Sequence, residues 1–186
     1  MGQIKVTRCG IEGLCVIEPT VHRDERGYFV ETYNENDMKA EGLDLRFVQD
    51  NQSMSQKGVL RGLHFQKQFP QGKLVRVLRG SVFDVAVDLR ADSKTYGQWF
   101  GVELTEENMK QFYIPEGFAH GFYVMSDIAI FAYKCTDFYH PGDEGGLLYC
   151  DPEIGIDWPF DPDAPLIISD KDQKWLGLSE TFSFKK

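Results

Sequence analysis

The sequence predicts an all-β fold, either a jelly roll or a related double sheet. Short runs of alternating apolar and polar residues recur along the chain, separated by Gly, Pro and Asp. The 14 Phe, 8 Tyr and 18 Gly favour strands and tight turns over a helical bundle. With 186 residues, of which 42% are hydrophobic, the chain can bury one core without crosslinks. We therefore expect one domain over 1–186: N-terminal strands over about 1–46, a barrel over about 47–140 and a segment over about 141–186 that wraps the barrel.

The expected elements follow in chain order. Residues 13–19 and 27–33 are predicted strands, and the densely charged stretch 21–26 between them is a predicted surface loop. Residues 34–42 are predicted to form a short peripheral helix with Asn34 or Asn36 as its N-cap. Further strands are predicted within 47–89 and at 99–104, 112–115, 117–125 and 129–138.

Polar side chains alternate with apolar ones in the middle of the chain. His64 lies between Leu63 and Phe65, so in an extended strand its side chain points to the opposite face from theirs. Lys73 opens the next predicted strand, and Asp84 lies inside the strand after it, each at an alternate position among apolar residues. Polar residues at alternate positions of consecutive strands indicate a pocket lined by a sheet.

Charge and composition exclude several classes of protein. The formal net charge of −9 would repel nucleic acid and an anionic membrane, so neither is an expected partner. No apolar run approaches the roughly 20 residues of a membrane span, and the N-terminus lacks the apolar core of a signal peptide. The four cysteines form no CxxC pair, so we expect reduced thiols in a cytoplasmic protein.

One motif raises the possibility of a metal site. Residues 114–120 have the Pro-x-Gly-x-x-His spacing of the second cupin motif, in which the histidine, here His120, normally ligates a metal. The first cupin motif requires His-x-His followed by Glu, whereas this chain has His64-Phe65-Gln66 and then Lys73. Two usual ligands are missing and the lysine would compete with a cation, so no metal is expected. A metal-dependent dioxygenase or isomerase using His64 and His120 stays as an alternative.

Five blocks occur in the order and spacing of one enzyme family. They are DERGYFVETY, FVQDNQSMSQKGVLRGLHFQ, QGKLVRVLRGSVFDVAVDLR, IPEGFAHGF and ISDKD. With these blocks the chain resembles the dTDP-4-dehydrorhamnose 3,5-epimerases from Glu18 to about Trp175. The resemblance implies a cupin-type jelly roll, a homodimer and a cofactor-independent isomerase. Its substrate would be a dTDP-linked 4-keto-6-deoxy sugar, inverted at C3 and C5.

The resemblance also implies catalytic roles. A ketone at C4 acidifies the hydrogens at C3 and C5, so a base on one face and an acid on the other can invert each centre through an enolate. His64 would be the base, oriented by Asp172, and Tyr133 would deliver the proton from the opposite face. Lys73 would stabilise the enolate oxygen, with Asp84 as its ion-pair partner across adjacent strands. This chemistry requires no redox cofactor and no metal.

The resemblance assigns binding of the nucleotide half of the substrate to further residues of the same blocks. By resemblance, Arg26 and Arg61 would bind the diphosphate, because a guanidinium group matches phosphate oxygens. The other assigned residues would surround the thymidine or complete the site: Phe29, Glu31, Gln49, Asp50, Asn51, His120, Tyr139, which would stack on the base, Glu144 and Lys171. Arg26 and Glu31 precede the barrel strands, and the family pattern implies that such N-terminal strands cross to the partner subunit.

Other interpretations of the same residues stay open. Strand histidines are more often structural, tyrosines in aromatic stretches more often belong to the core, and charges on edge strands are often only solvated. Within the family, relatives with the same base and acid invert only C3 or act on other nucleotide-linked sugars. A non-catalytic sugar-nucleotide-binding jelly roll is a third candidate. It is disfavoured because binding alone requires neither a base nor an acid.

Overall fold

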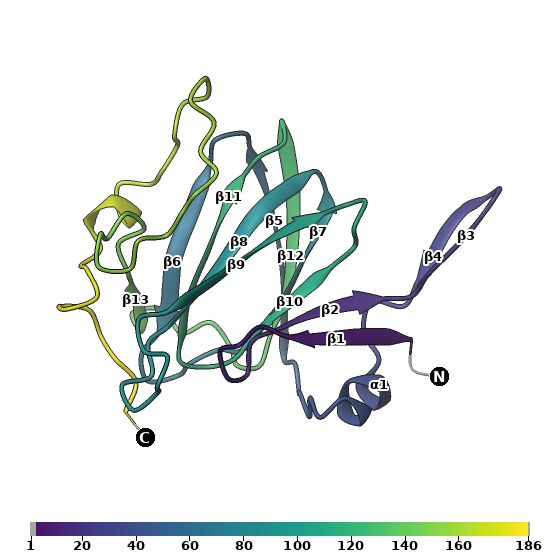
Figure 1. The fold of residues 1–186 in the computed structure, drawn as a ribbon, viewed down its shortest axis with the longest axis horizontal. Helices are drawn as coiled ribbons and strands as arrows, with labels where there is room; N and C mark the ends of the chain where they lie inside the picture. The colour runs from purple at the N-terminus through teal and green to yellow at the C-terminus, as the bar shows by residue number, and fades with distance from the viewer. Residues whose placement is uncertain (1–2, 186) are drawn as a thin grey trace.

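The structure, a computed structural model, describes residues 3–185 and contains two large antiparallel sheets (Figure 1). The six-stranded sheet comprises, in spatial order, β1 (Ile4–Arg8), β2 (Cys15–Pro19), β10 (Gln111–Ile114), β7 (Lys73–Arg79), β12 (Ile128–Cys135) and β5 (Gln49–Gln56). The five-stranded sheet comprises β13 (Glu144–Gly146), β6 (Leu60–Gln66), β11 (Phe118–Val124), β8 (Ser81–Asp88) and β9 (Trp99–Thr105). The predicted all-β sandwich of the jelly-roll type is confirmed, although the two sheets do not close into one barrel.

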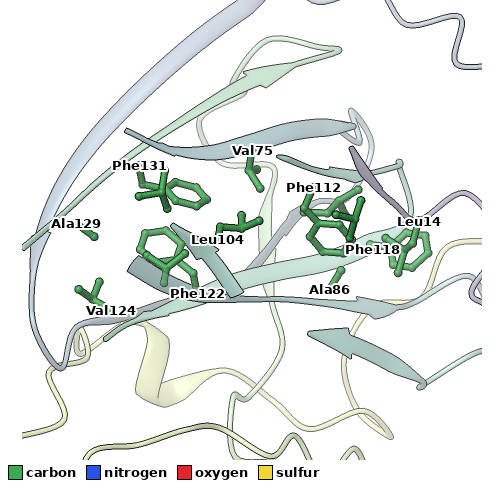
Figure 2. Packing of buried hydrophobic residues seen from close by; sticks show 14 of the residues in the cluster. Leu14, Val75, Ala86, Leu104, Phe112, Phe118, Phe122, Val124, Ala129 and Phe131 are labelled. Carbon is green, nitrogen blue, oxygen red and sulfur yellow. The ribbon is translucent and has the colours of Figure 1, made fainter. Parts of the chain in front are cut away.

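The main core lies between the two sheets (Figure 2). Phe112 and Phe131 come from the six-stranded sheet, and Leu104 and Phe122 come from the five-stranded sheet; none is more than 5% exposed. Phe122 and Phe131 stack with ring centroids 4.2 Å apart, which joins the two layers. Each strand with alternating apolar and polar residues therefore buries its apolar face against the other sheet, as the sequence pattern predicted.

A third, two-stranded sheet extends away from the sandwich as a hairpin (Figure 1). It consists of β3 (Val21–Asp24) and β4 (Gly27–Val30). The prediction of a loop over 21–26 is wrong for its first four residues, which pair with β4. A hairpin that is solvated on both faces does not require alternating apolar and polar residues. Its charged sequence therefore looks like the sequence of a surface loop. The aromatic side chains of Tyr28 and Phe29 are 58% and 68% exposed on it.

Helix α1 (Glu35–Ala40) covers part of the outer face of the six-stranded sheet. Its N-cap is Asn34, whose side-chain oxygen accepts hydrogen bonds from the backbone of Asn36 and Asp37. Met38 is 1% exposed and packs in the cluster that includes Leu74 of β7. The predicted short helix is confirmed. Among the described residues, every helix is too short or too polar to span a bilayer.

The C-terminal segment covers the outer face of the five-stranded sheet (Figure 1). Trp158 and Leu178 from this segment pack in one buried cluster with Leu63 and Phe65 of β6. The segment includes β13, which the sequence analysis did not predict and which pairs with β6, and the 3-10 helix η1 (Asp172–Lys174). Through these contacts the end of the chain returns to β6.

Candidate active site

A histidine–aspartate pair joins β6 to the C-terminal segment. His64 Nε2 lies 2.6 Å from Oδ1 of Asp172. Leu63 and Phe65 are buried on the outer face of the sheet, so His64 projects toward the interior, where 29% of its side chain is exposed. If Nε2–H donates to the carboxylate, Nδ1 is the ring nitrogen left to accept a proton. This arrangement is the one that a histidine general base requires.

Asp172 is held by three other groups besides His64. The Gly62 backbone N–H donates to Oδ2 at 3.2 Å, Trp175 Nε1–H donates to Oδ1 at 3.2 Å, and the Asp172 backbone N–H donates to Ser169 Oγ. Burial raises the pKa of Asp172, but the hydrogen bonds from His64, Gly62 and Trp175 outweigh burial, so its pKa lies below the usual range. Asp172 is therefore ionised at neutral pH and can stabilise positive charge on His64.

Gly62 allows the strands to meet closely beside this pair. Its φ is +118°, and a Cβ placed there would lie 2.7 Å from both the Gly121 Cα and the His120 carbonyl oxygen. The register between β6 and β11 shifts at the same place. Leu60 and Leu63 consequently both pack on the outer face. Arg61 and His64 then both face the interior.

Tyr133 lies on the facing sheet. It belongs to β12, where it pairs with Val75 of β7 and packs against the main core beside Phe131. Burial is the main cause that raises the pKa of Tyr133, with Cys135 and Glu144 adding to it and Arg61 opposing it. The phenol is therefore protonated at neutral pH, as a proton donor must be.

Lys73 begins β7 on the same interior face as Val75. Its amine makes no hydrogen bond and no ion pair within residues 3–185. Burial lowers the pKa of Lys73, against the raising influence of Cys135, Asp84 and Glu144. The donors of this amine are thus available to an oxygen atom of a ligand.

Asp84 binds His120 and not Lys73. His120 Nε2 lies 2.9 and 3.0 Å from the two carboxylate oxygens of Asp84. The predicted ion pair of Lys73 with Asp84 across adjacent strands is wrong, because β7 and β8 belong to different sheets. Burial lowers the pKa of His120 and raises the pKa of Asp84. His120 is also the β11 partner of His64 in the sheet register.

Two further cations lie beside the histidine–aspartate pair. Arg61 Nε donates to Ser55 Oγ at 2.9 Å, which leaves the end of the guanidinium group for an anion. Lys171 Nζ donates to Oε2 of Glu144 at 2.7 Å. Lys171 precedes Asp172 in the chain, and Glu144 lies in the strand that pairs with β6. The structure therefore brings Arg61, Glu144 and Lys171 to the region of His64.

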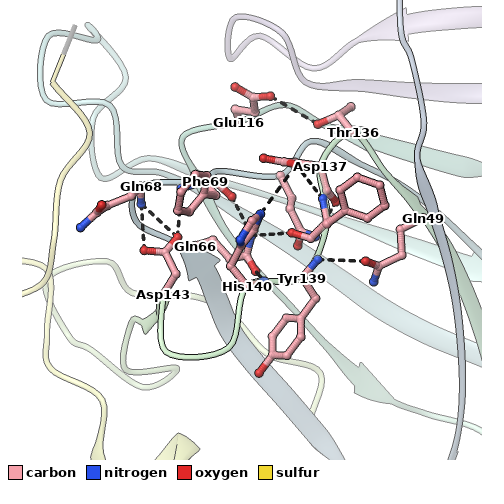
Figure 3. A network of polar contacts seen from close by, with 12 residues as sticks. Gln49, Gln66, Gln68, Phe69, Glu116, Thr136, Asp137, Tyr139, His140 and Asp143 are labelled. Atoms are coloured by element: carbon pink, nitrogen blue, oxygen red, sulfur yellow. Dashed lines mark hydrogen bonds and ion pairs between the residues drawn. The ribbon is translucent and has the colours of Figure 1, made fainter.

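The predicted base-binding residues Gln49, Asn51 and Tyr139 lie next to one another. Gln49 Nε2 donates to Asn51 Oδ1 at 3.1 Å, and the Tyr139 backbone N–H donates to Gln49 Oε1 at 2.9 Å. The loop carrying Tyr139 is held by Gln66, which accepts from the backbone N–H of His140 at 2.8 Å (Figure 3). Figure 3 shows the phenol ring of Tyr139 pointing away from this network, and the residue is 54% exposed. A planar ligand can reach that ring.

Four predicted binding residues lie elsewhere in this chain. Asp50 is on the outer face of the six-stranded sheet, where it accepts a hydrogen bond from Lys134 at 3.0 Å. Arg26, Phe29 and Glu31 lie on or beside the hairpin, which extends away from β6 (Figure 1). A single chain does not bring these four residues to His64.

Sequence reasoning missed three groups in the site. Trp175 bonds to Asp172 and packs edge-on against His64, with ring centroids 6.4 Å apart. The backbone N–H of Gly62 binds the same carboxylate, and Ser55 binds Arg61. Ser55 could have been found by continuing the alternation of Gln49 and Asn51 along one strand face. Trp175 follows Asp172 by three residues, a spacing that one helical turn brings together.

Within residues 3–185, no group of three or more His, Cys, Asp or Glu side chains is placed to hold a metal ion. His64 and His120 are instead bonded to Asp172 and Asp84. The described part of the chain therefore offers no ligand set to the metal-dependent alternative.

The site combines a histidine paired with a carboxylate on one sheet, a protonated phenol on the facing sheet and a lysine amine that is unbonded among residues 3–185. These groups suit a β-sandwich enzyme for acid–base chemistry beside a carbonyl group. Inversion of a carbon centre by proton transfer is the isomerase form of that chemistry. The chain belongs to the dTDP-4-dehydrorhamnose 3,5-epimerase family, which it matches over residues 8–180. The predicted family and the prediction of an isomerase are thereby confirmed.

Similar proteins cover almost the whole chain. A dTDP-4-dehydrorhamnose 3,5-epimerase from Methanothermobacter thermautotrophicus is 57% identical over 180 residues, which is 97% of each chain. A dTDP-6-deoxy-D-glucose-3,5-epimerase from Legionella pneumophila, solved in complex with dTDP-4-keto-L-rhamnose, has a TM-score of 0.91 and 52% identity, covering 95% of this chain and 94% of that chain. A dTDP-4-dehydrorhamnose 3-epimerase from Streptomyces niveus is 43% identical over 173 residues, which is 92% of this chain and 82% of that one.

Proposed function

We propose that the enzyme inverts C3 and C5 of dTDP-4-dehydro-6-deoxy-D-glucose and so forms dTDP-4-dehydro-L-rhamnose. The observation that carries the proposal is the His64–Asp172 pair, 2.6 Å apart, on the sheet that faces Tyr133. The names of similar proteins support the substrate, because the Legionella enzyme was solved with dTDP-4-keto-L-rhamnose. A base and an acid on opposite sheets match a reaction that removes a proton from one face of a sugar and returns one to the other.

The steps follow from the placement of the side chains. His64 Nδ1 takes the proton from the carbon beside the C4 ketone, and the C–H electron pair moves into the enolate. The Lys73 amine donates to the enolate oxygen at C4, where negative charge develops. Tyr133 then gives its phenolic proton to the same carbon from the opposite face. Exchange with solvent removes the proton from His64 and returns one to Tyr133, so the enzyme is restored without a redox cofactor.

We infer that the enzyme acts as a homodimer in which the hairpin of one subunit completes the site of the other. The hairpin carries Arg26 and the exposed Phe29, and it extends away from β6, the strand that contains His64 (Figure 1). The outer face of the six-stranded sheet also exposes Met54 at 59%, beyond the region that α1 covers. Exposed apolar side chains on a hairpin and on a sheet face suit a protein interface. Arg26 of one subunit would then join Arg61 of the other on the diphosphate.

A cytoplasmic location is part of the same proposal. The four thiols, Cys9, Cys15, Cys135 and Cys150, are all unpaired in the structure. Unpaired cysteines suit a reducing compartment, where disulfides are rare. Fractionation of cells that express the protein, followed by immunodetection, is the measurement that checks the location.

The test is turnover of dTDP-4-dehydro-6-deoxy-D-glucose in deuterated water, followed by proton NMR. Loss of signal at both C3 and C5, together with formation of the L-rhamno product, is the expected result. Activity should survive treatment with a chelator, which separates this reaction from a metal-dependent one. An unchanged substrate spectrum after prolonged incubation would overturn the proposal.

Inversion at C3 alone is the second candidate function. The similarity to the 3-epimerase from Streptomyces niveus favours it, because one base and one acid serve one centre as well as two. The same experiment decides between them. Deuterium at C3 with full retention of the hydrogen at C5 would show that the enzyme is a 3-epimerase.

A further inference from the structure

The strand β13 forms the edge of the five-stranded sheet beside β6. In the register of the two strands, Gly145 lies opposite Phe65 and Gly146 lies opposite His64. A Cβ placed on Gly145 would meet the ring of Phe65 on the outer face of the sheet. A Cβ placed on Gly146 would instead overlap the indole of Trp175, including its Nε1 atom. The indole therefore lies on the His64 face of the sheet, in the space that the absent side chain of Gly146 leaves.

Contacts on both sides of η1 hold the indole in this place. The backbone carbonyl of the residue after Trp175 accepts a hydrogen bond from the Leu148 N–H, just beyond β13, at 2.9 Å. Lys171, the residue before Asp172, is bonded to Glu144 of β13 at 2.7 Å. Its Nζ atom lies 6.0 Å from the centroid of the Trp175 ring. The segment that carries Asp172 is thus tied to the region of β13 at both of its ends.

The indole reaches the histidine–aspartate pair through one carboxylate oxygen. Trp175 Nε1–H donates to Oδ1 of Asp172 at 3.2 Å, and His64 Nε2 lies 2.6 Å from the same oxygen. The Gly62 N–H binds the other oxygen at 3.2 Å, and Asp172 is only 3% exposed. The indole also meets the His64 ring edge-on, with an interplanar angle of 75°. Removing the indole would therefore free one side of the carboxylate and one side of the imidazole ring.

The proposed proton transfers assign no part to Trp175 or Gly146. We propose that the Trp175 indole, seated on Gly146, is the positioning group that fixes the carboxylate of Asp172. Through that carboxylate it holds the His64 ring in the orientation that a base requires. The effect on turnover rests on the proposed function, whereas the contact between the indole and the carboxylate does not. Orientation matters because a misplacement of about 1 Å can lower a rate by roughly a hundredfold.

The first test compares two neighbouring glycines. Gly145→Ala and Gly146→Ala are matched, because both glycines are buried in β13, neither has a φ in the left-handed region and each new Cβ meets an aromatic ring. Gly146→Ala should lower kcat by about tenfold to a hundredfold without weakening dTDP binding, because the displaced indole no longer holds Asp172. Gly145→Ala should keep its kcat, because its Cβ meets Phe65 on the outer face. Equal kcat values in the two variants would overturn the proposal.

Variants of Trp175 cover the case in which Gly146→Ala does not fold. Trp175→Ala removes the indole and should lower kcat by a similar factor, while Trp175→Phe, which keeps a ring without the N–H, should lower it less. Adding Gly146→Ala to Trp175→Ala should cause no further loss, because the new Cβ then meets no indole. An unchanged kcat in folded Trp175→Ala, or a further loss in the double variant, would contradict the proposal.

NMR of the indole N–H groups tests the contact without turnover. The chain contains three Trp, and the resonance that is absent in Trp175→Phe identifies Trp175. This resonance should move upfield in Asp172→Asn and in Gly146→Ala, because a hydrogen bond to a charged carboxylate is shorter and stronger than one to a neutral group. It should stay in place in Gly145→Ala. A resonance that does not move in Asp172→Asn would overturn the proposal. Absence of turnover in the unmodified enzyme, with the expected shifts present, would contradict the proposed function alone.

Discussion

At the scale of single residues, the proposed role of His64 as the base depends on the neighbouring groups that hold its ring. Replacing it with Asn keeps a polar side chain of smaller size but removes the proton acceptor. We expect His64→Asn to lower kcat by roughly a hundredfold or more, the usual contribution of a general base. Affinity for dTDP should be unchanged, because the proposal assigns the phosphates to other groups such as Arg61. Steady-state kinetics and calorimetry measure the two quantities, and retention of more than about a tenth of the activity would show that His64 is not the base.

Tyr133→Phe tests the acid separately from the base. The enolate can still form in this variant, but no phenol is present to protonate it on the inverting face. Deuterium from solvent should still enter C3, because His64 can return a proton to the face it came from. Formation of the inverted product should fall roughly a hundredfold to ten-thousandfold. Tyr113→Phe is the control, since Tyr113 is 8% exposed in the cluster beneath α1.

Exchange and inversion are both measured by NMR in deuterated water. If both rates fall by the same factor in Tyr133→Phe, the tyrosine positions the substrate and another group is the acid. If neither rate falls, Tyr133 only packs against Phe131.

At the scale of elements, the close approach of β6 to β11 at Gly62 determines where the carboxylate of Asp172 is anchored. Gly62→Ala should lower the free energy of unfolding by about 2 kcal/mol or more, because a Cβ at this φ is strained and meets the neighbouring backbone. Gly10→Ala is the matched control: φ is +79° there, but no atom lies within 4 Å of the added Cβ. Urea unfolding compares the two variants, and equal losses would show that the approach of the strands carries no extra cost.

The end of β8 gives a prediction about pH. Burial raises the pKa of Asp88, but hydrogen bonds from Arg90, Ser93 and Thr95 outweigh it and lower the pKa below its usual range. The ionised carboxylate is therefore favoured by folding. Its stabilisation is fully present above the unfolded pKa of about 3.9 and is lost as the pH falls through the lower folded pKa.

Asp88→Asn should therefore lower Tm at neutral pH, and its difference from the unmodified protein should shrink in acid. Thermal unfolding at several pH values measures this trend. The exposed Asp127→Asn is the control and should change Tm little at any pH. A difference for Asp88→Asn that stays constant with pH would contradict the assignment.

At the scale of the whole molecule, the hairpin is the part that one chain does not explain. If it completes the site of a partner, two inactive variants should restore each other. His64→Asn has an intact hairpin, and Phe29→Ala with Arg26→Ala has an intact base. A mixed dimer has one complete site out of two, so the purified mixed dimer should show about half of the normal activity.

Co-expression with two different affinity tags, followed by assay of the purified mixed dimer, is the measurement. A mixed dimer without restored activity would place the hairpin in its own subunit's site. A molecular mass of one chain, measured by light scattering, would contradict the proposed homodimer.

Much of the fold and part of the site could be predicted from the sequence alone. Alternation of period two fixes which face of a strand is buried, so the outward Leu63 and Phe65 and the inward His64 follow from local order. The N-cap at Asn34 is likewise a local signal. Short polar segments without alternation, such as β3 and β13, were not predicted as strands, because they pair without burying an apolar face.

The tertiary structure decided which polar groups meet. Asp84 pairs with His120 and not with Lys73, because strand order within a sheet depends on contacts between distant segments. Trp175 reaches His64 only because the C-terminal segment packs across the outer face of β6. The position of Asp50 is different, because neighbouring residues of a strand point to opposite faces, so its place on the face opposite to Asn51 could be predicted from the sequence. The contacts of Asp84 with His120 and of Trp175 with His64 could not be predicted in this way, because long-range packing leaves no periodic pattern in the sequence.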